Sequence, residues 1–170
     1  RLLPCCGTLG YAIAECEGAV HEACRSANIG TMRMRRVGRD LLDTAGAEQA
    51  KRNLRDIGRI NRWLGGHRIV RNLIGDLFDE QDSFTVLDVG AASGDMGMAV
   101  QSRFSNSRVI SLDLRLRNLA EAPGLRLVGD AFRLPVMEGS ADVVLCSLFL
   151  HHFEDEDAVR LLATFERVAR

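Results

Sequence analysis

Short apolar runs alternate with amphipathic stretches along the second half of the chain. Four runs have the length of a β-strand, at 85–89, 108–112, 125–128 and 142–147. The segments between and after them predict a helix over 95–104, a shorter helix over 116–120, a loop over 130–139 and a last helix from 155 onward. Strands that alternate with helices form right-handed βαβ units around a parallel sheet. The pattern therefore predicts an α/β fold.

Two amphipathic helices are predicted before the first strand. The first begins near residue 47 and ends at the glycine pair 65–66, because glycine commonly follows the last helical turn. The second ends near the acidic cluster 79–82. Their predicted inward-facing residues are Ala50, Leu54, Ile57, Asn61 and Leu64 in the first, and Val70, Leu73, Ile74 and Leu77 in the second. We therefore divide the chain into an unassigned leader (1–31), a helical cap (32–82) and a sheet domain (83–170).

Composition places the chain among globular proteins. It has 170 residues, 46% of them hydrophobic and 26% charged, with a net charge of −1. Such a chain buries enough apolar surface to fold and is not expected to be disordered. The longest uncharged stretch, 2–14, is interrupted by Pro4, Gly7 and Gly10 and is shorter than the roughly 20 apolar residues of a membrane span. We expect a cytoplasmic protein without a membrane partner.

Charge is divided unevenly along the chain. Residues 32–75 carry eleven basic and four acidic side chains, whereas residues 76–170 carry nine basic and sixteen acidic ones. The basic part either docks on the acidic part or faces an anionic partner. Its arginines have helical spacing without interleaved aromatic residues, which favours a solvated helix face over a nucleic-acid surface. No nucleic-acid partner is therefore predicted, and the oligomeric state stays open.

Cysteines cluster near the start of the chain. Cys5, Cys6, Cys16 and Cys24 surround His21, but no C-x2-C pair is present and the spacings match no common zinc site. We predict no metal site. Cys146 lies in an apolar run and is expected to be buried.

The stretch 86–95 follows a predicted strand and opens a helix, where parallel sheets bind ligands. A dinucleotide loop needs glycines where this chain has Ala92 and Asp95, and no Gly-Lys-Ser/Thr sequence follows for a triphosphate. The loop instead suits a nucleoside without phosphates that carries a cationic or zwitterionic tail. Two alternatives remain open: an NAD(P)-binding oxidoreductase domain, and a non-catalytic binding module of the same fold.

The run Leu87-Asp88-Val89-Gly90-Ala91-Ala92-Ser93-Gly94 resembles the first motif of class I S-adenosylmethionine-dependent methyltransferases, which commonly have glycine in place of Ala92. Three further stretches resemble the later motifs in the family's order, namely 109–113, 129–135 and 142–153. The resemblance covers 84–170. It implies a Rossmann-like open sheet with S-adenosyl-L-methionine as cofactor. It also implies that the chain holds the first four of seven strands, is incomplete at its C-terminus and leaves the fourth strand as an open edge.

The same resemblance implies a set of site residues. The implied cofactor-binding residues are Asp88, Gly90, Ala91, Ala92, Gly94, Asp113, Leu114, Asp130, Ala131 and Ser147. Asp113 would accept hydrogen bonds from the ribose hydroxyls, and the pair Asp130-Ala131 would meet the adenine. Asp88 interrupts an apolar strand, and a buried carboxylate needs a partner, either loop amides or a ligand ammonium. Asp113 and Asp130 also suit local roles, as a solvated strand end and a loop cap.

Two histidines are the candidate catalytic residues. His151 and His152 follow the fourth predicted strand, and either suits a general base, a substrate-positioning donor or a structural hydrogen bond in the turn. The run 60–67 resembles small-molecule methyltransferases of bacterial secondary metabolism, which implies O- or C-methylation of a small acceptor. Within it, Trp63 is expected in the core rather than against a substrate. His67 suits two roles equally well, a contact with the substrate and a cap at the end of the helix.

Overall fold

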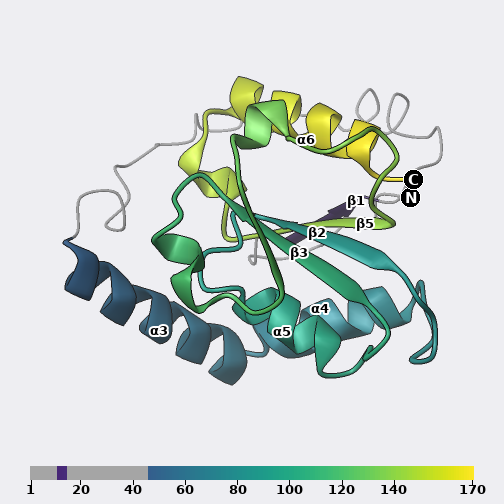
Figure 1. The fold of residues 1–170 in the computed structure, drawn as a ribbon, viewed down its shortest axis with the longest axis horizontal. Coiled ribbons are helices and arrows are strands. Elements are labelled where there is room, and N and C mark those ends of the chain that lie inside the picture. Colours follow the sequence, from purple (N-terminus) through teal and green to yellow (C-terminus); the bar gives the residue numbers. More distant parts are fainter. Residues whose placement is uncertain (1–10, 15–45) are drawn as a thin grey trace, which may run out of the picture.

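β2 (Thr85–Val89) lies at the centre of a five-stranded sheet in the computed structural model, which describes residues 11–14 and 46–170 (Figure 1). The strand order is β1-β5-β2-β3-β4. The other strands are β1 (Tyr11–Ala14), β3 (Arg108–Asp113), β4 (Leu125–Val128) and β5 (Val143–Ser147). The pairs β2–β3, β2–β5 and β3–β4 are parallel. The predicted α/β fold with a Rossmann-like parallel sheet is therefore confirmed.

The helices lie in two layers on opposite faces of this sheet (Figure 1). One layer contains α4 (Gly66–Gly75) and α5 (Asp95–Gln101), and α6 (Asp155–Val168) covers the other face. The helix expected over 95–104 ends three residues early. The one expected over 116–120 is a short 3-10 turn, η1 (Asn118–Glu121). Two further 3-10 turns are η2 (Ala131–Arg133) and η3 (Leu150–His152).

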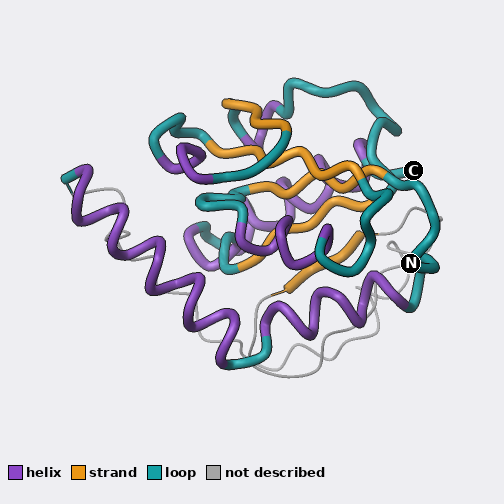
Figure 2. The backbone as a smooth tube through the Cα atoms, turned by 60° about the horizontal axis from the view of Figure 1, so that its bottom comes forward, coloured by secondary structure: helices purple, strands orange, loops and turns teal. Residues whose placement is uncertain are grey.

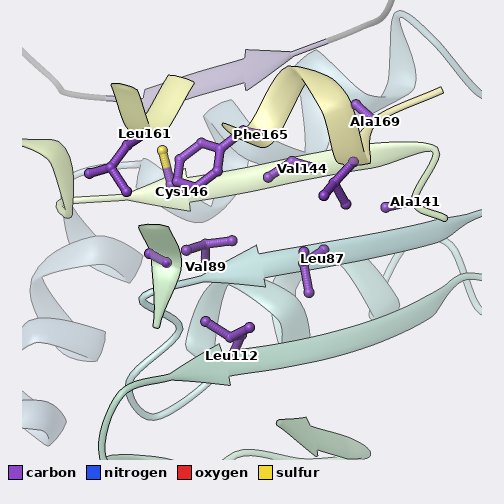
Figure 3. Packing of buried hydrophobic residues seen from close by; sticks show 11 residues of the cluster. Leu87, Val89, Leu112, Ala141, Val144, Cys146, Leu161, Phe165 and Ala169 are labelled. Carbon is purple, nitrogen blue, oxygen red and sulfur yellow. The ribbon is translucent and has the colours of Figure 1, made fainter. Parts of the chain in front are cut away.

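Alternate residues of β2 and β5 feed two separate cores. Val86 of β2 and Leu145 of β5 pack with Phe104 in the core under α4 and α5. Leu87 of β2 and Val144 of β5 pack with α6 in the second core, which Figure 3 shows from close by. Asp88 lies on the α5 side of β2, because side chains alternate between the faces of a strand. The buried position predicted for Cys146, in the α6 core, is confirmed.

The expectation of an open edge at the fourth predicted strand is wrong. β1 pairs with β5 in antiparallel orientation, from Tyr11 opposite Ser147 to Ala14 opposite Val144. Residues 11–14 belong to the leader that shows no periodicity, so a four-residue strand escaped the sequence pattern. Because this pairing occupies the outer backbone groups of β5, that edge is covered in the structure. Cys5, Cys6, Cys16, Cys24 and His21 lie outside the described residues.

The two cap helices, α3 (Ala47–Trp63) and α4, meet at a sharp corner (Figure 2). Gly65 occupies this corner with φ +86°, a conformation that glycine adopts without strain. The predicted inward stripe of α3 holds at Ala50, Leu54 and Asn61, which are buried. It is wrong at Leu64, which lies beyond the last residue of the helix and is 69% exposed.

The expected core position of Trp63 is also wrong, because its side chain is 85% exposed. In α4, Val70 and Ile74 are fully buried as predicted, and Leu73 and Leu77 pack against the same core. None of the helices among the described residues is long and apolar enough to span a membrane.

Candidate functional site

A cavity of about 660 Å³ opens at the carboxyl ends of β2, β3 and β5. Its wall also includes the turn after β4, the segment after β5, and Ile57 and Asn61 of α3. Of the residues predicted from sequence, the structure brings these to the cavity: Asp88, Gly90, Ala91, Ala92, Asp113, Leu114, Asp130, Ala131, Ser147, His151 and His152. Gly94 does not line it. One cavity therefore unites the first motif with the residues that follow the other strands.

Three alternate residues of the glycine loop between β2 and α5 have a left-handed backbone conformation. Gly90, Ala92 and Gly94 have φ values of +70°, +49° and +71°. Gly90 lies directly against the Phe149 ring, where a Cβ atom would overlap the aromatic carbons. Gly94 faces Ala122 and Pro123 instead, behind the cavity wall. Gly90 thus shapes the ligand side of the loop, whereas Gly94 allows the loop to pack on the residues that follow η1.

Asp113 at the end of β3 organises the loop next to it. Its Oδ2 accepts a hydrogen bond from the Ala92 amide at 3.2 Å. Its Oδ1 accepts from the Arg115 amide at 2.9 Å and from Asn118 Nδ2 at 3.0 Å. These donors hold a buried carboxylate at the cavity and link the ends of two neighbouring strands.

Asp88 has the most unusual environment of the site. Its side chain is buried, and Oδ2 has no hydrogen-bond partner, so the loop amides expected as its partners do not bind that oxygen. Burial raises the pKa of the Asp88 carboxyl from 3.8 to about 7, and the negative charge of Asp95 adds to the rise. The nearby Gly97 amide opposes this rise without cancelling it. A buried carboxylate with one unpartnered oxygen at a cavity favours a cationic ligand group.

Side chains of both cap helices bind Asp95, and the sequence pattern did not predict these contacts. Asn61 Nδ2 of α3 donates to Asp95 Oδ2 at 2.9 Å, and His67 Nε2 of α4 lies 2.9 Å from the same oxygen. The signal was present in the sequence, because Asn61 is a polar residue on an otherwise apolar stripe. His67 therefore binds Asp95, the first residue of α5, instead of acting as the predicted helix-end cap.

Aromatic side chains line the wall formed after β4 and β5. Phe132 packs edge-on against Phe153, with ring centroids 5.5 Å apart, and Phe153 lies 5.0 Å from Phe149. The His151 and His152 rings lie 3.9 Å apart beside this cluster. Asp130 on the same side is exposed, and its Oδ1 accepts from the Phe132 amide at 2.9 Å, so it caps η2 while it borders the cavity.

Further polar atoms at the cavity lack a partner. Asn118 Oδ1 and Ser147 Oγ are buried without hydrogen bonds, like Asp88 Oδ2. Buried polar groups are normally satisfied, so unpartnered ones beside a cavity are typical of a ligand site. Across residues 46–170 and β1, no cluster of three or more His, Cys, Asp or Glu side chains gathers to bind a metal ion.

Gly90→Ala should destabilise the protein, whereas Ala92→Gly should not. Gly90→Ala places a Cβ atom on the Phe149 ring at a positive φ, and we expect a loss of about 2 kcal/mol in the free energy of unfolding. Ala92→Gly removes a strained side chain, so the change should stay within about 1 kcal/mol. Urea denaturation of both variants measures this, and equal losses would contradict the role given to Gly90.

Asp88→Asn should stabilise the ligand-free protein at pH 8 and not at pH 4.5. A folded-state pKa raised from 3.8 to about 7 means that wild-type stability falls as pH rises through this window. The shift corresponds to at most ~4 kcal/mol, of which the neutral amide should recover roughly half. Thermal and urea denaturation at both pH values test this. Asp76→Asn, at an exposed carboxylate, is the control, and identical pH profiles for wild type and Asp88→Asn would refute the assignment.

Comparisons with known proteins identify the family. Residues 86–170 match a family model described as "Methyltransferase domain". A malonyl-[acyl-carrier protein] O-methyltransferase from Xylella fastidiosa is 32% identical over 99 residues, and a strychnine O-methyltransferase from Strychnos nux-vomica is 33% identical over 90 residues. These alignments cover 52% and 49% of this chain. They span only 34% and 24% of the relatives.

A solved structure supports the fold. Magnesium protoporphyrin IX methyltransferase from Synechocystis PCC 6803, which contains bound S-adenosylmethionine, superposes with a TM-score of 0.53 at 17% identity. The match covers 66% of this chain and 58% of that one. The residues that match the family model include the glycine loop and nearly the whole cavity wall. The chain belongs to the methyltransferase-domain family.

Proposed function

We propose that the chain is the cofactor-binding part of an S-adenosylmethionine-dependent methyltransferase that acts on a small-molecule acceptor, at oxygen or carbon. The observation that carries this proposal is the cavity at the end of β2, where the glycine loop, Asp88 with its unpartnered Oδ2, and Asp113 converge. An adenosyl ligand without phosphates suits these acidic groups, whereas the pyrophosphate of NAD(P) would meet Asp88 and Asp95. The family assignment likewise argues against the oxidoreductase alternative.

The residues at the cavity fit the chemistry of this cofactor. Asp113 would accept hydrogen bonds from the ribose hydroxyls, because its carboxylate borders the cavity at the end of the second parallel strand. Asp130 and Ala131 would meet the adenine beside the Phe132 ring. The Asp88 carboxylate would neutralise the cationic tail of the cofactor. Leu114 and Ser147 also line the cavity.

The bound cofactor supplies an already activated methyl group on a sulfonium sulfur. The protein then contributes proximity and orientation rather than a covalent intermediate. His151 and His152 border the cavity after β5, and this position supports the proposal that one of the imidazoles takes a proton from a hydroxyl acceptor. Phe132, Phe149 and Phe153 line the same region, where they would shield a bound ligand from water.

The name of one relative supports a small-molecule acceptor, and the name of the other indicates a different type. Strychnine is a small molecule, and the malonyl relative acts on a group carried by a protein. The resemblance of 60–67 to small-molecule methyltransferases of secondary metabolism supports a small-molecule acceptor. The cytoplasmic location and the absence of nucleic-acid and membrane partners stay predictions. A screen of acceptor hydroxyls and carbon acids for release of S-adenosylhomocysteine separates an enzyme from a non-catalytic binding module.

Asp113→Ala should weaken binding of S-adenosylhomocysteine by at least ~10-fold in isothermal titration calorimetry, because the ribose hydroxyls lose their acceptor. Asp113 also holds the Ala92 amide, so loop damage must be separated from lost ribose contact. A 2′,3′-dideoxy analogue makes this separation. It should bind wild type and Asp113→Ala nearly equally, and a variant that discriminates between the two ligands as strongly as wild type would contradict the ribose role.

Cofactor affinity should rise with pH up to about 7 and then level off. A cationic tail favours the ionised Asp88 carboxyl, whose pKa is about 7 in the ligand-free protein, so binding below pH 7 must release a proton. We expect up to ~10-fold weaker binding of S-adenosylmethionine per pH unit below 7. Asp88→Asn should abolish this slope. Calorimetry between pH 5.5 and 8.5 measures it, and an unchanged slope in the variant would assign the titration to another group.

A further inference from the structure

One carboxylate oxygen joins both cap helices to the glycine loop. Asp95 Oδ2 accepts from Asn61, two residues before the end of α3, and binds His67, the second residue of α4. The two helices meet at the corner that Figure 2 shows between these residues. Both contacts are well protected, since Asn61 is 5% exposed and the side chains of His67 and Asp95 are 20% and 12% exposed.

The same contact continues through the backbone on either side. Asp95 directly follows Gly94, whose amide closes the glycine loop by donating to the Ala91 carbonyl at 2.8 Å. On the other side of the contact, the α3 backbone passes close to Asp95, because a Cβ atom added at Gly58 would lie 3.8 Å from Asp95 Cβ. Ile57 and Asn61 then form the α3 part of the cavity wall. The Asp95 side chain therefore links the order of the glycine loop to the position of α3.

We propose that Asp95 is a positioning residue that couples docking of the cap helices to occupation of the cavity. A ligand that orders the glycine loop also fixes the Asp95 carboxylate, so Asn61 and His67 bind it at a smaller entropic cost. By linkage, the docked cap must strengthen ligand binding by the same factor. Asp95 thereby sets the position of the α3 part of the cavity wall. This inference rests on the proposed function for the identity of the ligand.

Hydrogen exchange of α3 amides tests the coupling, with S-adenosylhomocysteine as the probe ligand. In wild type we expect the ligand to slow exchange over 54–63 by at least ~5-fold. His67→Ala and Asn61→Ala should lose most of this gain and bind the ligand roughly 3- to 10-fold more weakly. Trp63 is the only tryptophan and ends α3, so its fluorescence anisotropy gives a second readout, which should fall in both variants.

Conservative and matched variants separate positioning from general loss of stability. His67→Gln keeps an N–H donor near the position of Nε2 and should restore exchange protection and affinity. Asn72→Ala changes an exposed amide side chain on α4 and should behave as wild type. Equal α3 protection in wild type and His67→Ala, or no rescue by His67→Gln, would overturn the proposal.

The ligand-free proteins distinguish this proposal from the proposed function. Faster α3 exchange and lower Trp63 anisotropy in ligand-free His67→Ala support the contact between the cap and Asp95 on their own. Failure of wild type to bind S-adenosylhomocysteine would overturn the proposed function and the coupling, while leaving that ligand-free comparison to decide the contact.

Discussion

Parallel pairing of β2 with both β3 and β5 is the constraint from which the site follows. The register sets Val89 opposite Leu112 and Asp88 opposite Leu145, so the three strands end at one edge of the sheet. Each chain segment that leaves this edge starts beside the other two. The glycine loop, Asp113 and the aromatic segment after β5 therefore lie close together, although they are far apart in the sequence. The helices on both faces bury the strands whose alignment produces this meeting.

Four aspartates around the cavity show that environment, rather than residue type, sets the role of a carboxylate. Asp113 accepts three hydrogen bonds, Asp95 binds two side chains of the cap, and Asp130 caps a local turn. Asp88 has an oxygen without a partner, and burial raises the pKa of its carboxyl. Its ionised form therefore weakens the ligand-free fold. A cationic ligand would relieve that cost, so stability and binding oppose each other at this residue.

The sheet and the cavity were predictable because their signals are local. Strand-length apolar runs and the glycines that follow β2 fix where strands end, and parallel order fixes which ends meet. The predicted burial of Trp63 and Leu64 was wrong because α3 ends at Trp63. Periodicity does not show within one turn where a helix ends. β1 was missed because four residues carry too little pattern. The bonds of Asp95 were missed because they join residues 28 and 34 positions apart, across an interval that local patterns do not span.

Asn61 shows how such a long-range contact still leaves a trace in sequence. A side-chain amide on an apolar stripe is costly to bury unless it forms a hydrogen bond. Its presence therefore indicates a polar group on the facing element. That group, Asp95, begins the helix that follows the glycine loop. The cap is therefore more than a cover, because part of the cavity wall belongs to a helix that is docked through a residue adjoining the loop. A change in the glycine loop is therefore expected to alter the α3 part of the cavity wall as well.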